Sequence, residues 1–264
     1  MIVVKIVGGI GNQMFQYALF RNLLEQGKDV YYDSLQTTEH NGFELENVFN
    51  IEKRPINSIK EIENLTVIGD TTWPRYNDKI LQTKDNTYLE GNWQHINYFP
   101  DNNILYKDFS FKQKLDEKNT QLLEEIQNSN SVSIHVRRGD FLHDRLPHFF
   151  PTWLNYYGLA ANYISTKSRE RPLKFFVFSD DVNWCKTNFL LPMNYSENDK
   201  TGGWKDLYLM SQCKHNITTN STFSWWGAKL NKNKDKIVIT PKVWFYDYGN
   251  EIMNSILPKN WIRM

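Results

Sequence analysis

The chain has 264 residues, enough for one large or two small domains. Its 31 basic and 30 acidic residues nearly cancel, so no overall positive field favours nucleic acid and a phosphate site has to be local. The two cysteines have neither a disulfide framework nor zinc-ligand spacing, which indicates a reducing compartment. No apolar run approaches the ~18 residues that span a bilayer. We therefore expect a cytoplasmic protein that binds no nucleic acid.

The amino-terminal segment has the pattern of a nucleotide-binding α/β unit. Residues 2–7 predict a buried strand, three glycines at 8, 9 and 11 predict a tight turn, and residues 12–26 predict a helix. Backbone amides at the helix start can face an anion. The alternative is that the glycines only allow close packing of strand and helix. Residues 30–33 predict a second strand.

The next hundred residues carry a weaker signal. Residues 34–103 are irregular, and within them Trp93 and Gln94 combine an aromatic ring with a hydrogen-bonding amide. This pair is either a ligand contact or a strand end with a packed tryptophan. Residues 115–127 have helical spacing and are followed by a polar break. We place the domain boundary there, which gives domains 1–128 and 129–264.

The central segment of the second half alternates apolar and polar residues over 132–136, the pattern of a strand. It ends in Arg137, Arg138, Gly139 and Asp140. Ligands of open parallel sheets bind beyond the carboxyl ends of the strands. Two guanidinium groups there suit a phosphate, because each offers a planar pair of donors. The alternative is a surface turn in which arginine pairs with aspartate.

Further strand–helix units follow. A helical pattern covers 152–165, and an apolar run at 175–178 ends at Asp180 and Asp181, which can bind a nucleoside or a metal or cap the next helix. A helix at 204–213 and a strand at 216–219 precede a helix at 223–230, and a last strand is expected at 236–240. Ser221, Thr222 and Ser224 gather at the start of the helix at 223–230, where hydroxyls and free amides suit a phosphate or simply cap the helix.

Three segments together resemble one enzyme family. Residues 8–18 read GGIGNQMFQYA, residues 135–140 read HVRRGD, and residues 220–228 read NSTFSWWGA. In this order they resemble the bacterial type of the α1,2-fucosyltransferases, glycosyltransferase family 11. The element order fits an α/β protein with two Rossmann-like domains facing a cleft, and the resemblance implies the same GT-B-like fold. It implies that the amino-terminal domain binds the acceptor and the carboxy-terminal domain binds GDP-fucose.

The resemblance also implies a reaction. L-Fucose would pass from GDP-β-L-fucose to O2 of a galactose in a glycan, with inversion and with no cofactor. The sequence has no Asp-x-Asp motif for a metal, and fixed cations can replace one. The alternatives are another nucleotide sugar or linkage, and an inactive glycan-binding protein. If the acceptor is lipid-linked, we expect peripheral contact with the inner face of the membrane.

The site residues are assigned by matching the family motifs. Arg137 is expected to meet charge on the β-phosphate, and Asp140 is a candidate base that the sequence does not separate from His143, Asp144 or His148. Trp93 and Gln94 are expected to bind the acceptor. The residues expected to bind the donor are Asn12, Gln13, His135, Arg137, Arg138, Asp180, Asp181, Ser221, Thr222, Phe223 and Ser224.

Overall fold

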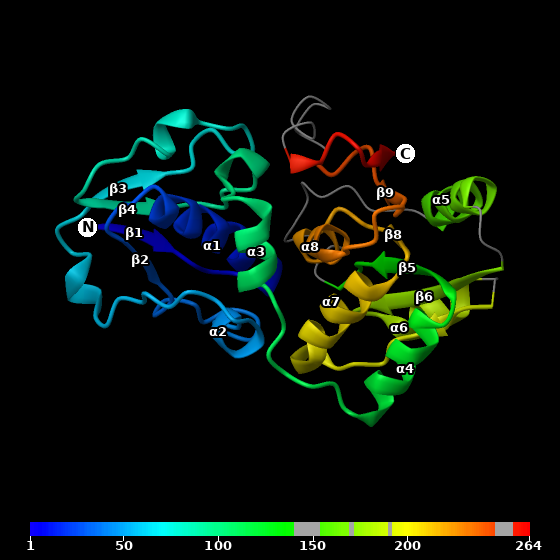
Figure 1. Cartoon of the computed structure of the whole chain (residues 1–264). Coiled ribbons are helices and arrows are strands. Elements are labelled where there is room, and N and C mark those ends of the chain that lie inside the picture. The colour runs from blue at the N-terminus through cyan, green and yellow to red at the C-terminus, as the bar shows by residue number, and fades with distance from the viewer. Residues whose placement is uncertain (140–153, 169–171, 190–191, 246–255) are drawn as a thin grey trace. The chain divides into compact units, whose positions relative to one another are not determined.

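The computed structural model describes residues 1–139, 154–168, 172–189, 192–245 and 256–264 (Figure 1). Its internal contacts divide the chain into two compact units. The first unit is Met1–Gln113 with Asn254–Pro258, and the second is Lys114–Met253 with Lys259–Met264. The boundary therefore lies before the predicted position at residue 128. Helix α4 (Glu117–Gln127) accounts for the difference, because it packs against α7 (Gly203–Gln212) of the second unit.

The first unit is built on a four-stranded parallel sheet with the order β2-β1-β4-β3. The strands are β1 (Ile2–Lys5), β2 (Val30–Asp33), β3 (Thr66–Gly69) and β4 (Thr87–Glu90). Helix α1 (Ile10–Glu25) packs on β1 and β2, and eleven of its residues are buried. The smaller helices are α2 (Leu45–Val48), η1 (Ile59–Glu61), η2 (Asp78–Ile80), η3 (Ile96–Tyr98) and α3 (Asn102–Asp108).

The turn between β1 and α1 requires a glycine. Gly8 has a φ of +80°, a conformation that is strained for residues with a side chain. A Cβ atom on Gly8 would also lie 3.2 Å from Nδ2 of Asn12. The chain can therefore turn sharply here, so that α1 packs on β1.

The second unit contains a six-stranded parallel sheet with the order β10-β9-β8-β5-β6-β7 (Figure 1). The strands are β5 (Asn130–Val136), β6 (Leu173–Ser179), β7 (Asn194–Tyr195), β8 (His215–Ile217), β9 (Val238–Thr240) and β10 (Ile262–Arg263). The remaining helices are α5 (Leu154–Lys167), α6 (Val182–Asn188), η5 (Lys200–Gly202) and α8 (Thr222–Leu230). Every residue of β5 is buried, as expected for a strand inside a parallel sheet.

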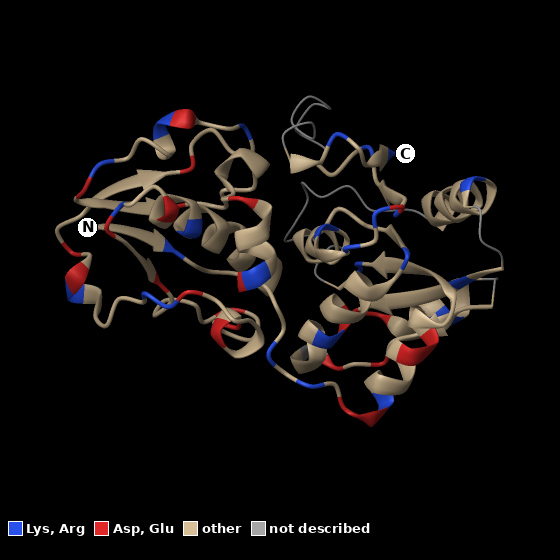
Figure 2. Cartoon of the chain, in the orientation of Figure 1, with Lys and Arg blue, Asp and Glu red and all other residues tan. Residues whose placement is uncertain are grey.

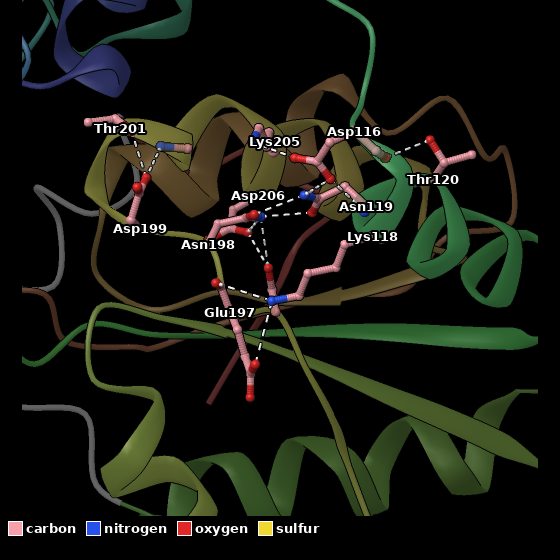
Figure 3. A network of polar contacts seen from close by, with 12 residues as sticks. Asp116, Lys118, Asn119, Thr120, Glu197, Asn198, Asp199, Thr201, Lys205 and Asp206 are labelled. Atoms are coloured by element: carbon pink, nitrogen blue, oxygen red, sulfur yellow. Dashed lines mark hydrogen bonds and ion pairs between the residues drawn. The ribbon is translucent and has the colours of Figure 1, made fainter.

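A polar network ties α4 to the rest of the second unit (Figure 3). Asp116 caps α4 and pairs with Lys205 of α7 at 2.6 Å. The side-chain amides of Asn119 and Asn198 donate to each other, both at 2.9 Å. Asn198 also donates to Oδ1 of Asp206 at 2.8 Å, and desolvation raises the pKa of Asp206 to about 6. The network fixes the first helix of this unit to the helix that precedes β8.

Basic and acidic residues are interspersed along the chain of each unit (Figure 2). This distribution follows the near balance of 31 basic and 30 acidic residues. A cationic site in this chain therefore depends on a few positioned side chains rather than on a broad basic surface.

Candidate functional site

The central strands of the second unit bring three predicted segments to one edge of the sheet. Strands β5, β6 and β8 run parallel, with Val136 opposite Ser179 and Ile134 opposite Ile217. Their carboxyl ends therefore share an edge, where ligands of such sheets bind. The segments that follow them are Arg137–Gly139, Asp180–Asp181 and Thr218–Ser221. The arginine loop, defined as Arg137–Gly139, thus lies between the other two segments.

One carboxylate organises the arginine loop. Asp180 accepts the backbone N–H of Arg138 at 2.9 Å and pairs with Nη1 of Arg137 at 3.1 Å. Gly139 allows this close approach, because a Cβ atom there would lie 2.7 Å from Oδ2 of Asp180. The side chain of Arg137 keeps 28% of its surface exposed. The guanidinium therefore pairs with Asp180 and is partly exposed to solvent.

Arg138 is held differently from its neighbour. Its Nε donates to Asp181 at 3.2 Å, and its guanidinium carbon lies 3.7 Å from the ring centroid of Trp184. Asp181 also caps α6 by accepting the N–H of Trp184 at 3.1 Å. Arg138 is thus fixed against α6 by an ion pair and a cation–π contact.

Both structural alternatives to ligand binding are present at this edge. The arginines of the loop pair with Asp180 and Asp181, and Asp181 caps the following helix. Both carboxylates, which we expected at the nucleoside, contact the arginine loop or its side chains. Asp140 and the alternative bases at 143, 144 and 148 lie outside the described residues.

The start of α8 lies at the same edge, and one of its hydroxyls caps the helix. Ser221 accepts the N–H of Phe223 at 3.3 Å. Ser224 is buried, and its hydroxyl accepts the N–H of Thr219 at 3.3 Å. Thr222 is the first residue of the helix and is half-buried. The capping interpretation therefore holds for Ser221, and the positive end of the helix dipole lies beside the arginine loop.

His135, which is expected to bind the donor, is buried. The side chain is 5% exposed, and its ring packs on Phe223 with centroids 5.3 Å apart. Burial, with the nearby Arg137 charge, lowers the pKa of His135 to about 3. Its Nδ1 has no hydrogen-bond partner within the described parts of the chain. A neutral imidazole is thus packed between β5 and the start of α8.

The far end of α8 is also anchored. The Nζ of Lys236 donates to the carbonyl oxygens of Ala228 and Asn231 at 2.7 and 2.6 Å. These bonds satisfy acceptors that a helix end otherwise leaves open. Trp225 and Trp226 are fully buried along the helix. The helix is therefore fixed at both ends and along its length.

Asn12 and Gln13, predicted to bind the donor, belong to the first unit. Gln13 is fully buried, and its amide donates to the carbonyls of Gly8 and Gly42 at 2.7 and 2.8 Å. It also accepts the N–H of Glu44 at 3.0 Å. Its side chain is thus engaged in joining the glycine turn to the segment before α2. Asn12 is half-buried and accepts from Gln94 at 3.0 Å.

The predicted acceptor pair lies in the same unit, and its tryptophan faces the core. Trp93 is fully buried, with its ring edge-on to Tyr98 at 5.9 Å. Its side chain is therefore packed, as the second of the two interpretations expected, and it lies three residues beyond the end of β4 at Glu90. Gln94 is 7% exposed and connects two other side chains. It accepts the indole N–H of Trp73 at 3.1 Å and donates to Asn12. Trp73 was not predicted as a site residue, because the sequence around it has no helix or strand pattern.

Two further observations concern other kinds of site. Within the described residues, no three His, Cys, Asp or Glu side chains gather as metal ligands would. In the same residues, no helix combines the length and the apolar character needed to cross a membrane.

Comparison with known proteins identifies the family. An "Alpha-1,2-colitosyltransferase" of Escherichia coli is 31% identical, over 100% of this chain and 98% of that protein. "Galactoside alpha-(1,2)-fucosyltransferase 1" of Homo sapiens is 33% identical over 111 residues, which are 38% of this chain and 28% of that protein. A solved NodZ alpha-1,6-fucosyltransferase, soaked with GDP-fucose, superposes with a TM-score of 0.54 at 15% identity, over 87% of this chain and 91% of that chain.

The structural likeness confirms a GT-B-like α/β fold. The family model "Glycosyl transferase family 11" matches residues 1–264. This match covers the glycine turn, the arginine loop and the start of α8, which are the three segments that carried the resemblance. The chain therefore belongs to glycosyl transferase family 11, a family with fucosyltransferase members.

Proposed function

We propose that this glycosyltransferase moves L-fucose from GDP-β-L-fucose to O2 of a galactose, with inversion and without a metal ion. One observation carries the proposal: a partly exposed Arg137 and the amino-terminal end of α8 lie at the same carboxyl edge of a parallel sheet. Such an edge binds nucleotides, and both groups attract the negative charge of a diphosphate. The α1,2 linkage is named in the bacterial and the human relative.

In the proposed reaction, O2 of the galactose attacks C1 of fucose from the face opposite the leaving group. The O2–C1 bond forms as the bond from C1 to the β-phosphate oxygen breaks, and the O2 proton passes to a base. Negative charge grows on the β-phosphate. Arg137 and the α8 amides can stabilise this charge, because they are fixed in place before the reaction starts. In this proposal they take the role that a divalent metal has in many other glycosyltransferases.

Arg138 has a supporting role in this mechanism. Its contacts to Asp181 and Trp184 direct its guanidinium toward α6. A guanidinium committed to these partners has less freedom to follow a leaving phosphate. We therefore assign transition-state stabilisation to Arg137 and local structure to Arg138.

A second candidate is transfer of colitose, because the bacterial colitosyltransferase matches the whole chain. The test supplies GDP-fucose, GDP-colitose, GDP-mannose and UDP-galactose separately, each with lactose as acceptor. We expect a product only from GDP-fucose, with an α1,2 linkage by NMR. A product only from GDP-colitose would favour the second candidate, and a different linkage or a uridine donor would refute both.

A further inference from the structure

The first unit presents a second sheet edge of the ligand-binding type. Its strands β1, β3 and β4 are parallel and end at Lys5, Gly69 and Glu90. The segments that follow them are the glycine turn with Asn12, residues 70–77, and residues 91–95. Because carboxyl ends of parallel strands share one edge, these segments lie together.

Hydrogen bonds fix the loop after β3 to the residues that follow β4. Asp70 accepts the N–H of Trp93 at 3.1 Å. The indole N–H of Trp73 donates to Gln94 at 3.1 Å, and the backbone N–H of Asn77 donates to the hydroxyl of Tyr98 at 2.9 Å. Residues 70–77 therefore have a defined position on this edge.

Two aromatic side chains of this loop are only half-buried. They are Trp73 and Tyr76, in contrast with the fully buried Trp93. The ring of Tyr76 packs against the rings of His95 and Tyr98, with centroids 5.1 and 5.0 Å away. Because these contacts restrict its orientation and its surface is not fully buried, the ring of Tyr76 can contact a ligand in a defined position.

A chain of hydrogen bonds connects this aromatic pair to the glycine turn. Trp73 donates to Gln94, and Gln94 donates to the Oδ1 of Asn12 at 3.0 Å. The bond fixes the orientation of the Asn12 amide, whose Nδ2 is a donor. Asn12 is half-buried at the start of α1. The edge thus combines partly exposed aromatic rings with an oriented amide.

This combination suits a pyranose. One face of a galactose ring carries a patch of C–H groups that packs on aromatic rings, while its hydroxyls need oriented donors and acceptors. We propose that Trp73 and Tyr76 form the acceptor subsite, with Asn12 directed at a hydroxyl of the galactose and Gln94 as a positioning residue. The inference rests on the proposed function. It replaces Trp93 with Trp73 as the tryptophan that contacts the sugar, and it assigns Asn12 to the acceptor instead of the donor.

The test uses the full-length chain with Trp73→Ala and Tyr76→Ala, and Tyr163→Ala as the control. Tyr163 is a half-buried tyrosine on α5 of the other unit. We measure KM for lactose, KM for GDP-fucose, and hydrolysis of GDP-fucose without acceptor. Each site variant should raise KM for lactose about tenfold or more, as loss of a well-packed aromatic contact does. The donor KM and the hydrolysis rate should stay unchanged, and the control should match the wild type.

Trp73→Phe separates the ring from the hydrogen bond. It keeps an aromatic face and loses the N–H that holds Gln94, so we expect KM for lactose between those of the wild type and Trp73→Ala. Saturation-transfer NMR with lactose alone gives a second readout that needs no donor. Unchanged lactose binding in both alanine variants, or no galactoside binding by the wild type, would overturn the proposal. Failure of the proposed function differs, because then the wild type neither binds nor hydrolyses GDP-fucose.

Discussion

Replacing each arginine of the loop by lysine separates their roles. Both changes keep the positive charge, but lysine lacks the planar guanidinium fork. Arg137→Lys removes a donor aimed at the leaving phosphate. Loss of one such donor costs about 10²–10³ in kcat in other enzymes. We expect that loss here, with kcat and kcat/KM falling together because the contact strengthens in the transition state.

Arg138→Lys should behave in the opposite way. Its side chain is 22% exposed and its partner Asp181 is 39% exposed, so the ion pair is of the surface type and contributes about 0–1 kcal/mol. The cation–π contact with Trp184 contributes about 0.5–1 kcal/mol. We expect unfolding to become easier by about 1 kcal/mol, which is a Tm decrease of about 2–4 °C for a chain of this size. The kcat should fall by less than about tenfold.

The assays are steady-state transfer from GDP-fucose to lactose and thermal unfolding by circular dichroism. The reasoning requires a large kcat loss with little Tm change for Arg137→Lys, and the reverse for Arg138→Lys. Wild-type kcat in a folded Arg137→Lys variant would remove this residue from the mechanism. A larger kcat loss for Arg138→Lys than for Arg137→Lys would show that Arg138 acts on the donor despite its contacts with α6.

Three further predictions concern the proposed donor site and the polar network at α4. By calorimetry, GDP should bind about ten- to a hundredfold more tightly than GMP, because a charge-assisted hydrogen bond to the second phosphate is worth about 1.5–3 kcal/mol. Equal affinities would show that Arg137 does not contact that phosphate. Transfer should continue at an unchanged rate in EDTA, and a strict requirement for added Mn²⁺ or Mg²⁺ would refute the metal-free mechanism. Finally, the raised pKa of Asp206, about 6, means that its stabilising contribution is present below pH ~4 and is lost as pH rises to ~6. The free energy of unfolding of the wild type, measured with urea, should therefore fall by up to about 3 kcal/mol across this range, and that of Asp206→Asn should not. Parallel pH profiles of the two proteins would contradict this assignment.

The sequence predicted the elements that have strong local signals. The strand Val30–Asp33 has the predicted bounds, and α1, β5, β6 and α8 differ from prediction by a few residues. These segments are long or almost fully buried, so their apolar pattern is continuous. Strand β3 was missed, because it has four residues and every one of them except Ile68 is exposed. A short edge strand is defined by its partner more than by its own residues.

The candidate site was predicted at the level of segments rather than of side chains. Sequence placed Arg137, Asp180 and Ser221 beyond strand ends, and the sheet brings those ends together. It did not predict that Asp180 contacts the backbone of Arg138, because that contact depends on the register of two strands. Trp93 was chosen over Trp73 for a related reason: burial of an aromatic residue in a loop depends on tertiary packing.

The anchoring of α8 at both ends has a consequence for how fast a ligand is captured. Ser221 caps one end and Lys236 binds the carbonyls at the other, while the tryptophans between them are buried. A helix held in this way has its first-turn amides aligned before any diphosphate arrives, so little conformational entropy is lost on binding. Association with the start of α8 should then be a single bimolecular step whose rate rises linearly with nucleotide concentration, because no ordering step follows the encounter.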